Sequence, residues 1–271
     1  MQFADILLAI EDEAIPIAAQ TWDNSGIQVA SGRTDVSTLA VCLDPTRSAV
    51  SRALELGADA ILSHHPLLLH PRLPDRMDDF REVLALLLSR DVPLYAAHTS
   101  LDANPQGPAG WLAEDLRMSD VTVLEAAPCV DDMALPPYGL GIVGNLPAPL
   151  EYRDLVEMLS KYCDRSLMTR CGPPPGTIDR LAYCTGSGSS LLEAAADADA
   201  HIFVTGDVKY HAAMEAPIPV LDVGHHGLEE EMMRRMSLLL QKKLPGVRVV
   251  FLPSASPFTP AANDCPIQEA S

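Results

Sequence analysis

Short apolar runs alternate with helical segments along this chain, and several of the runs lead directly into histidines. Residues 39–43 and 60–62 are predicted strands, and residues 47–56 between them have the periodicity of a helix that ends at Gly57. A strand–helix–strand unit of this length joins two parallel strands. The chain is therefore predicted to fold as an α/β protein, and the carboxyl ends of its parallel strands should line one crevice.

Six side chains suited to metal binding follow these apolar runs or begin the segments after them. Imidazoles and carboxylates together bind Zn, Mn, Fe or Ni well. The six residues are His64, His65, His98, Asp102, His225 and Glu229. Because the strand ends converge, the sequence predicts that these residues build a two-metal hydrolytic site.

The adjacent pair His64 and His65 restricts the local geometry. Neighbouring residues on a strand point to opposite faces, so both rings reach one site only where the strand has ended. Pro66 favours such an end, because proline restricts the residue before it and cannot donate to a strand ladder. The alternative is one buried and one exposed histidine. For His98 and Asp102, the alternative is a hydrogen-bonded pair within a loop.

The late pair, His225 and Glu229, is spaced four residues apart and would share one helix face. His226 and Glu230 have the same spacing, so spacing alone leaves the register open. A helix start with an acidic first turn, favoured by the helix dipole, is the alternative interpretation. The occurrence of three such pieces after three separate strands favours a metal site.

Composition and charge exclude several classes of function. The chain has 271 residues and a formal net charge of -18, and its basic doublets are isolated, so we expect no nucleic-acid partner. We expect no membrane partner either, because no uncharged apolar run reaches the roughly 18 residues of a membrane span. The first residues lack the basic start of a signal peptide. The six cysteines form no C-x-x-C pair, and we interpret them as reduced thiols in a cytoplasmic protein.

The order of the motifs predicts two α/β lobes, with the second inserted into the first. The early histidines and the late pair must meet, so residues 1–127 and 216–271 are predicted to form the metal-binding lobe. Residues 128–215 would form the inserted lobe, entered through a proline-bearing linker from about Ala127 to Pro137.

The motifs also resemble a known family, the GTP cyclohydrolase 1 type 2 homologues, also called Nif-three-like proteins, which have a dinuclear metal centre. The likeness covers nearly the whole chain, and the order and spacing of its blocks are specific although each block alone is weak. The blocks are Trp22-Asp23-Asn24-Ser25-Gly26, Ser63-His64-His65-Pro66, His98-Thr99-Ser100-Leu101-Asp102, Thr185-Gly186-Ser187-Gly188-Ser189, Gly206-Asp207-Val208-Lys209-Tyr210-His211 and Gly224-His225-His226-Gly227-Leu228-Glu229.

This resemblance implies a ligand set, a register and an assembly. Two divalent cations per chain, of Zn, Mn, Fe or Ni, would be bound with Glu229 bridging them. The implied ligands are His64, His65, Asp102, His225 and Glu229. His98 would lie beside the metals as a catalytic residue rather than a primary ligand, and six copies would form a toroidal homohexamer. The chain departs from the family at His226, where an aromatic residue is common, and at Leu228, where a hydroxyl residue is common. Neither departure removes a ligand.

Two hypotheses for the function follow. In the first, the protein is a metal-dependent hydrolase in which a hydroxide bridging the two metals attacks an electrophilic carbon or phosphorus, with His98 as a proton shuttle. The family name implies hydrolytic opening of the GTP purine ring. Nothing in the residues themselves selects guanine, so the expected partner is a small molecule, with a nucleotide as one candidate. In the second, the protein is a non-catalytic metal-binding module with a regulatory or protein-interaction role. We favour the enzyme.

Overall fold

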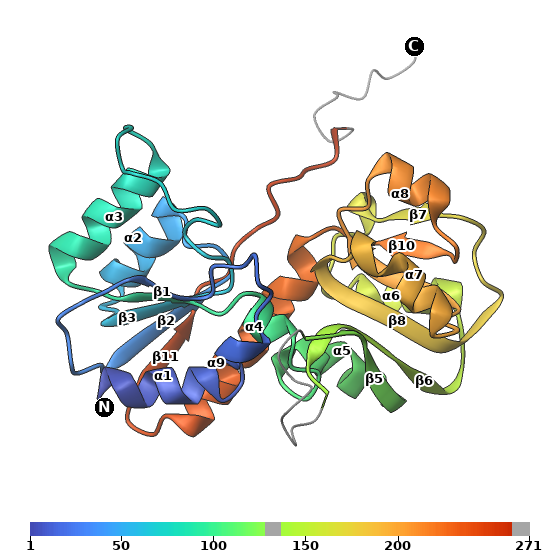
Figure 1. Ribbon diagram of the computed structural model, residues 1–271, viewed down its shortest axis with the longest axis horizontal. Coiled ribbons are helices and arrows are strands. Elements are labelled where there is room, and N and C mark those ends of the chain that lie inside the picture. The colour runs from blue at the N-terminus through green and yellow to red at the C-terminus, as the bar shows by residue number, and fades with distance from the viewer. Residues whose placement is uncertain (128–136, 262–271) are drawn as a thin grey trace, which may run out of the picture.

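The computed structural model describes residues 1–127 and 137–261. The described strands form two sheets, one in each half of the molecule, and helices pack against both (Figure 1). This is the mixed α/β architecture that the sequence predicts. Most of the predicted linker, residues 128–136, lies outside the described part of the chain.

The first sheet has five strands in the order β1-β4-β3-β2-β11. β1 pairs antiparallel with β4, and the other neighbours pair parallel. The parallel pairing predicted for residues 39–43 and 60–62 is thus confirmed by β2 and β3. The strands are β1 (Gly26–Val29), β2 (Thr38–Cys42), β3 (Ala60–Ser63), β4 (Leu94–Ala96) and β11 (Arg248–Phe251).

Helices cover both faces of the first sheet, as the alternation along β2 requires. Leu39 and Val41 share a hydrophobic cluster with α1 and α9, whereas Ala40 and Cys42 share another with α2 and α3. Successive strand side chains point to opposite faces, and burial of both faces is typical of a parallel sheet. The helices are α1 (Phe3–Glu11), α2 (Arg47–Glu55), α3 (Asp79–Arg90) and α9 (His226–Lys243).

The second sheet has six strands in the order β5-β6-β8-β9-β10-β7. The pairs β8–β9 and β9–β10 are parallel, and the other neighbours are antiparallel. The strands are β5 (Ser119–Ala126), β6 (Gly139–Glu151), β7 (Thr169–Cys171), β8 (Thr177–Ser187), β9 (Ile202–Gly206) and β10 (Val220–Asp222). The remaining helices are α4 (Thr99–Asp102), α5 (Trp111–Asp115), α6 (Tyr152–Leu159), α7 (Leu192–Asp197) and α8 (Tyr210–Glu215).

The second sheet spans a longer stretch of sequence than residues 128–215, the range expected for the inserted lobe. It starts with β5 at Ser119 and includes β10, which ends at Asp222. β5 is an edge strand whose side chains are mostly exposed, and its apolar residues Val121, Val123 and Leu124 make no continuous run of the kind that marks the buried strands. β10 lies between β9 and β7, which ties it to the second sheet.

Helix α9 joins the cores of the two halves. Met232, Met233 and Met236 are fully buried and belong to the same hydrophobic cluster as Leu62 of β3 and Val204 of β9. α9 therefore packs between the two sheets, and this packing fixes the positions of the side chains on its first turns. None of the helices that the structure describes is long and apolar enough to cross a membrane.

Candidate metal centre

Strand ends from both sheets meet at the start of α9. β3 and β4 of the first sheet lead into His64, His65 and His98, and β10 of the second sheet leads into His225. One turn into α9, the Glu229 carboxylate lies among the rings. Its oxygens are 3.5 Å from His64 Nε2, 3.2 Å from His65 Nε2 and 3.1 Å from His225 Nε2.

The His64–His65 pair confirms that β3 has ended before it. β3 stops at Ser63, whose hydroxyl donates to the carbonyl of His65 at 2.7 Å and stabilises the bend. The two imidazole centroids are 4.9 Å apart, so both rings turn to one side. His64 is fully buried and the His65 side chain is 21% exposed.

Each histidine of the centre has its Nδ1 atom against an oxygen acceptor. Because carbonyl and carboxylate oxygens accept, Nδ1 carries the proton and Nε2 turns its lone pair toward the centre. Metal-binding histidines in proteins are oriented in this way. The Nδ1 contacts are His64 to Ala97 O at 2.8 Å, His65 to Asp44 Oδ1 at 2.7 Å, His225 to Asp207 Oδ2 at 2.8 Å and His98 to Asp23 Oδ1 at 2.7 Å.

The centre needs a cation to be satisfied. The Nε2 atoms of His65 and His225 are 3.3 Å apart, so two lone pairs would face each other without a proton or metal between them. Among the described residues, Glu229 Oε2 and His64 Nε2 are buried without a hydrogen-bond partner. Because Glu229 Oε2 lies 3.2 Å from His65 Nε2 and 3.1 Å from His225 Nε2, it is paired only while these nitrogens carry protons or a cation lies between them.

The donor atoms also lie close enough together to share metal ions. The first group that could hold an ion is His64, His65 and His98, and the second is His65, His225 and Glu229. Within each group the ligand atoms lie within 4.8 Å of one another. This mixed nitrogen and oxygen set suits Zn, Mn, Fe, Ni or Co.

In the absence of metal, protons take the place of the ion. Burial alone would lower the pKa of His65, but its contacts with Asp44 and Glu229 raise that pKa to about 10. The contact with Glu229 raises the pKa of His225 to about 9 against a smaller effect of burial. Burial would raise the pKa of Glu229, and the neighbouring imidazoles outweigh it and hold that pKa well below its usual range. A metal ion must therefore displace protons.

Asp102, the fifth predicted ligand, lies at the end of α4. Its Oδ2 is 3.7 Å from His64 Nε2, and its Oδ1 accepts a hydrogen bond from Thr185 Oγ1 at 2.9 Å. Burial raises the pKa of this carboxyl group. The structure thus brings all five predicted ligands into one cluster.

His98 completes the cluster on the side of β4. Its ring centroid is 5.2 Å from that of His64 and 5.6 Å from that of His65. Burial would raise the pKa of Asp23, its Nδ1 partner, but hydrogen bonds from His98, Ser25 and Thr99 outweigh burial and lower that pKa. Nε2 of His98 therefore faces the centre and has the position of either a proton carrier or a ligand.

Two glycines allow the second sheet to pack closely against the centre. Gly186, near the end of β8, has φ +59°, and a Cβ atom there would overlap the Glu229 carboxylate. Gly206, at the end of β9, approaches the backbone of Gly224 so closely that a Cβ would lie 2.6 Å from its carbonyl. Both glycines let the second sheet reach the metal ligands.

The sequence alone did not reveal the three carboxylates that orient the histidines. Asp44 is the second residue after β2 and Asp207 the first after β9, so the strand-end rule that selected the histidines could have identified both. Asp23 precedes β1 in a turn-like segment and carries no such signal.

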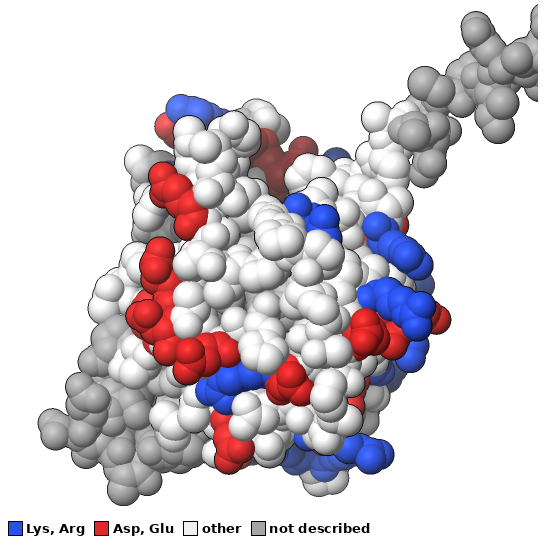
Figure 2. Space-filling model, turned by 90° about the vertical axis from the view of Figure 1, so that its right-hand side faces the viewer, with Lys and Arg blue, Asp and Glu red and all other residues white. Residues whose placement is uncertain are grey.

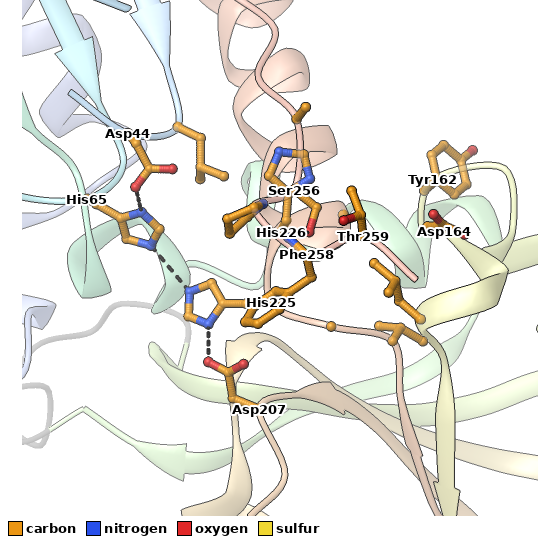
Figure 3. A pocket seen from close by; sticks show the side chains of 17 residues that line it. Asp44, His65, Tyr162, Asp164, Asp207, His225, His226, Ser256, Phe258 and Thr259 are labelled. Carbon is orange, nitrogen blue, oxygen red and sulfur yellow. Dashed lines mark hydrogen bonds and ion pairs between the residues drawn. The ribbon is translucent and has the colours of Figure 1, made fainter. Parts of the chain in front are cut away.

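A cavity of about 770 Å³ opens beside the centre (Figure 3). His65 and His225 lie on its wall together with their partners Asp44 and Asp207. Pockets for small molecules typically have volumes of about 300–1,000 Å³. A molecule of that size can therefore approach the metal ligands from solvent.

Comparison with known proteins identifies the family. The sequence model of the family described as Duf34/NIF3 (NGG1p interacting factor 3) matches residues 1–257. The chain belongs to this family. A DUF34/NIF3 relative from Clostridium perfringens, named GTP cyclohydrolase 1 type 2 homolog, is 27% identical over 249 residues, which cover 90% of this chain and 93% of the relative. A relative of the same name from Streptomyces coelicolor is 31% identical over 220 residues, covering 78% and 75%.

Solved DUF34/NIF3 structures share the fold. A Bacillus cereus protein related to NIF3 superposes with a TM-score of 0.84 at 19% identity, covering 96% of this chain and 99% of that chain. At this identity the likeness establishes the α/β fold alone. The family that the sequence motifs resemble is confirmed.

Proposed function

We propose that this DUF34/NIF3 protein is a metal-dependent hydrolase of the GTP cyclohydrolase 1 type 2 kind, with two divalent cations per chain. One observation carries the proposal: three imidazole Nε2 atoms lie within 3.5 Å of the buried carboxylate of Glu229. Four histidines have their other nitrogen fixed by an oxygen acceptor, which leaves Nε2 free for coordination.

Each residue has a role in this proposal. The ions would be held by His64, His65, Asp102, His225 and Glu229. The carboxylate of Glu229 lies among the imidazoles and would be available to both ions. When bound, the ions would lower the pKa of a water so that it can act as the nucleophile, and would polarise the bond under attack. Asp44 and Asp207 orient His65 and His225. His98, held by Asp23, moves a proton between the attacking water and the leaving group.

The substrate is a small molecule that reaches the centre through the adjoining cavity. The names of the relatives support GTP as a candidate, with hydrolytic opening of its purine ring. The cavity favours this enzyme over a non-catalytic metal-binding module, because a module would need no opening of about 770 Å³ beside its ions.

The test combines metal analysis with a hydrolysis assay. Wild-type protein should contain about two transition-metal ions per chain and should release formate from GTP in the presence of Mn, Zn or Fe. His64→Ala should lose metal and turnover. His201→Ala is the matched control, because this histidine is 43% exposed and pairs with Asp179 outside the centre. Equal turnover by His64→Ala and wild type would refute the enzyme, and a wild type that takes up no metal would refute the ligand set.

We further propose that six copies form a ring in the cytoplasm and that the protein binds neither nucleic acid nor membranes. Much of the face in Figure 2 is uncharged, with acidic side chains along one margin and basic ones along the other. In the same half of the molecule, Tyr210 and Met214 of α8 are 73% and 67% exposed. Exposed apolar side chains of this size favour contacts between chains. Light scattering should give the mass of six chains, and a monomer would refute the ring.

A further inference from the structure

The second pair of α9 with four-residue spacing, His226 and Glu230, holds the C-terminal segment. The backbone N–H of Ser254 donates to Glu230 Oε1 at 2.6 Å. The Ser254 hydroxyl lies 3.0 Å from Glu230 Oε2 and 2.9 Å from His226 Nε2. Because a carboxylate only accepts, the hydroxyl donates to Glu230 and accepts from His226. The chain after β11 is thereby fixed to the same helix turn that carries His225 and Glu229.

From this anchor the chain forms one wall of the cavity beside the metal centre. Residues 255–259 line the cavity together with Asp44 and His65, which follow strands of the first sheet. Figure 3 shows Phe258 projecting from this segment into the cavity that His225 also lines. Phe258 is 67% exposed, so a large aromatic surface is open to solvent here. Such a surface gains free energy when a flat apolar group covers it.

Away from the metal centre, the described wall of the cavity offers no basic side chain to a polyanion. None of the described residues that line it is a lysine or an arginine, whereas Asp44, Asp164 and Asp207 all line it. Proteins bind phosphate groups tightly through charge-assisted hydrogen bonds from such basic side chains. Asp44 and Asp207 are already paired with the rings of His65 and His225, so a phosphate that enters would find its cations at the metal centre and not along the cavity wall.

We infer that the cavity binds its substrate through an uncharged aromatic ring, that of a purine base or nucleoside, stacked on Phe258, and that side chains of the cavity do not bind a triphosphate. This inference rests on the proposed function, because the ring on Phe258 is the one presented to the metal centre. Ser254 is a positioning residue, since it sets where the segment with Phe258 leaves α9.

The test measures equilibrium binding of guanosine and of GTP to the Mn-loaded full-length protein by calorimetry. Any gain in affinity of GTP over guanosine should come from the Mn ions. In the metal-free protein the two dissociation constants should therefore agree within about threefold, because the cavity side chains give the phosphates no basic partner. Phe258→Ala should weaken guanosine binding at least about fivefold, the low end of what an aromatic–base stack contributes. Phe258→Trp should restore it. Ser254→Ala should weaken guanosine binding while the metal content stays that of wild type.

Leu8→Ala is the matched control, because Leu8 of α1 is also 67% exposed and does not line the cavity. GTP binding about tenfold tighter than guanosine binding in the metal-free protein would overturn the inference. Wild-type affinity in Phe258→Ala, or a wild type that binds no guanosine, would overturn it as well. If guanosine binding depended on Phe258 but the protein turned over no substrate, the inference would stand and the proposed hydrolase function would be refuted. If Phe258→Ala left the turnover of GTP unchanged, the proposed hydrolase would stand and the inference about Phe258 would be wrong.

Discussion

Raising the pH should tighten metal binding steeply, because metal ions and protons compete for the same nitrogen atoms. In the metal-free protein the pKa of His65 is about 10 and that of His225 is about 9, against an ordinary value of 6.5. Both rings are therefore protonated between pH 7 and 8. A metal ion binds the neutral imidazole, so its uptake releases about two protons from these residues.

The size of the effect follows from that proton count. Each proton released changes the dissociation constant about tenfold per pH unit, so the metal should bind ~100-fold more tightly at pH 8 than at pH 7, or ~2.7 kcal/mol. The slope should decline above about pH 9, where His225 loses its proton without help from the metal.

The stability of the metal-free protein should change in the opposite direction. Because the pKa values of His65 and His225 are raised on folding, their ion pairs stabilise the fold fully below pH 6.5. That contribution is lost as the pH rises through about 9 and 10. The melting temperature without metal should fall over this range, whereas the increment given by saturating Zn should grow.

Competition with a chelator at several pH values between 6.5 and 8.5 measures the affinity, and calorimetry in two buffers counts the protons. Asp44→Asn is the informative variant, because it removes the carboxylate that raises the pKa of His65, and its pH dependence should be shallower. A dissociation constant that stays flat with pH, corrected for the protonation of the chelator, would refute the arrangement of protonated imidazoles around Glu229.

Three substitutions test other parts of the centre. Gly186→Ala should abolish metal retention and cost ~2 kcal/mol or more in the free energy of unfolding, because the new Cβ displaces Glu229. The control is Gly176→Ala, which has open space around it and should retain metal in the same elemental analysis. Asp207→Asn should weaken Zn binding ~10- to 100-fold in the chelator assay, because His225 loses its orienting carboxylate, and unchanged affinity would contradict that role. His98→Ala should keep both metals and lose turnover, because the residue that carries the proton is missing. If the variant instead contained half the metal, His98 would be a ligand.

The strand-end rule predicted the centre because it depends on local signals. His64 and His98 follow β3 and β4, which are parallel neighbours and so end on the same edge of the first sheet. His225 follows β10 of the second sheet, so its position beside them depends on how the two sheets meet. The bend after β3 was also readable, since Pro66 cannot continue a strand. The register of the late pair was not readable, because His225 with Glu229 and His226 with Glu230 have the same spacing.

What escaped prediction depends on contacts between segments far apart in the sequence. Asp23 is 75 residues from His98, and only the folded chain brings the two within 2.7 Å. Strand β5 is held at the edge of the second sheet by pairing with β6 rather than by an apolar pattern of its own. The extent of the second sheet therefore could not be read from hydrophobic runs, and the expected boundaries at 128 and 215 fall inside it.

The ambiguity of register on α9 has a structural reason, because the helix uses both pairs. His225 and Glu229 face the metal centre, while His226 and Glu230 hold Ser254 and with it one wall of the cavity. Buried methionines fix the helix between the two sheets, so neither pair can move without the other. In the proposed enzyme, the distance between the attacking water and a ring resting on that wall would therefore be set by one rigid element, which is what precise orientation of a substrate requires.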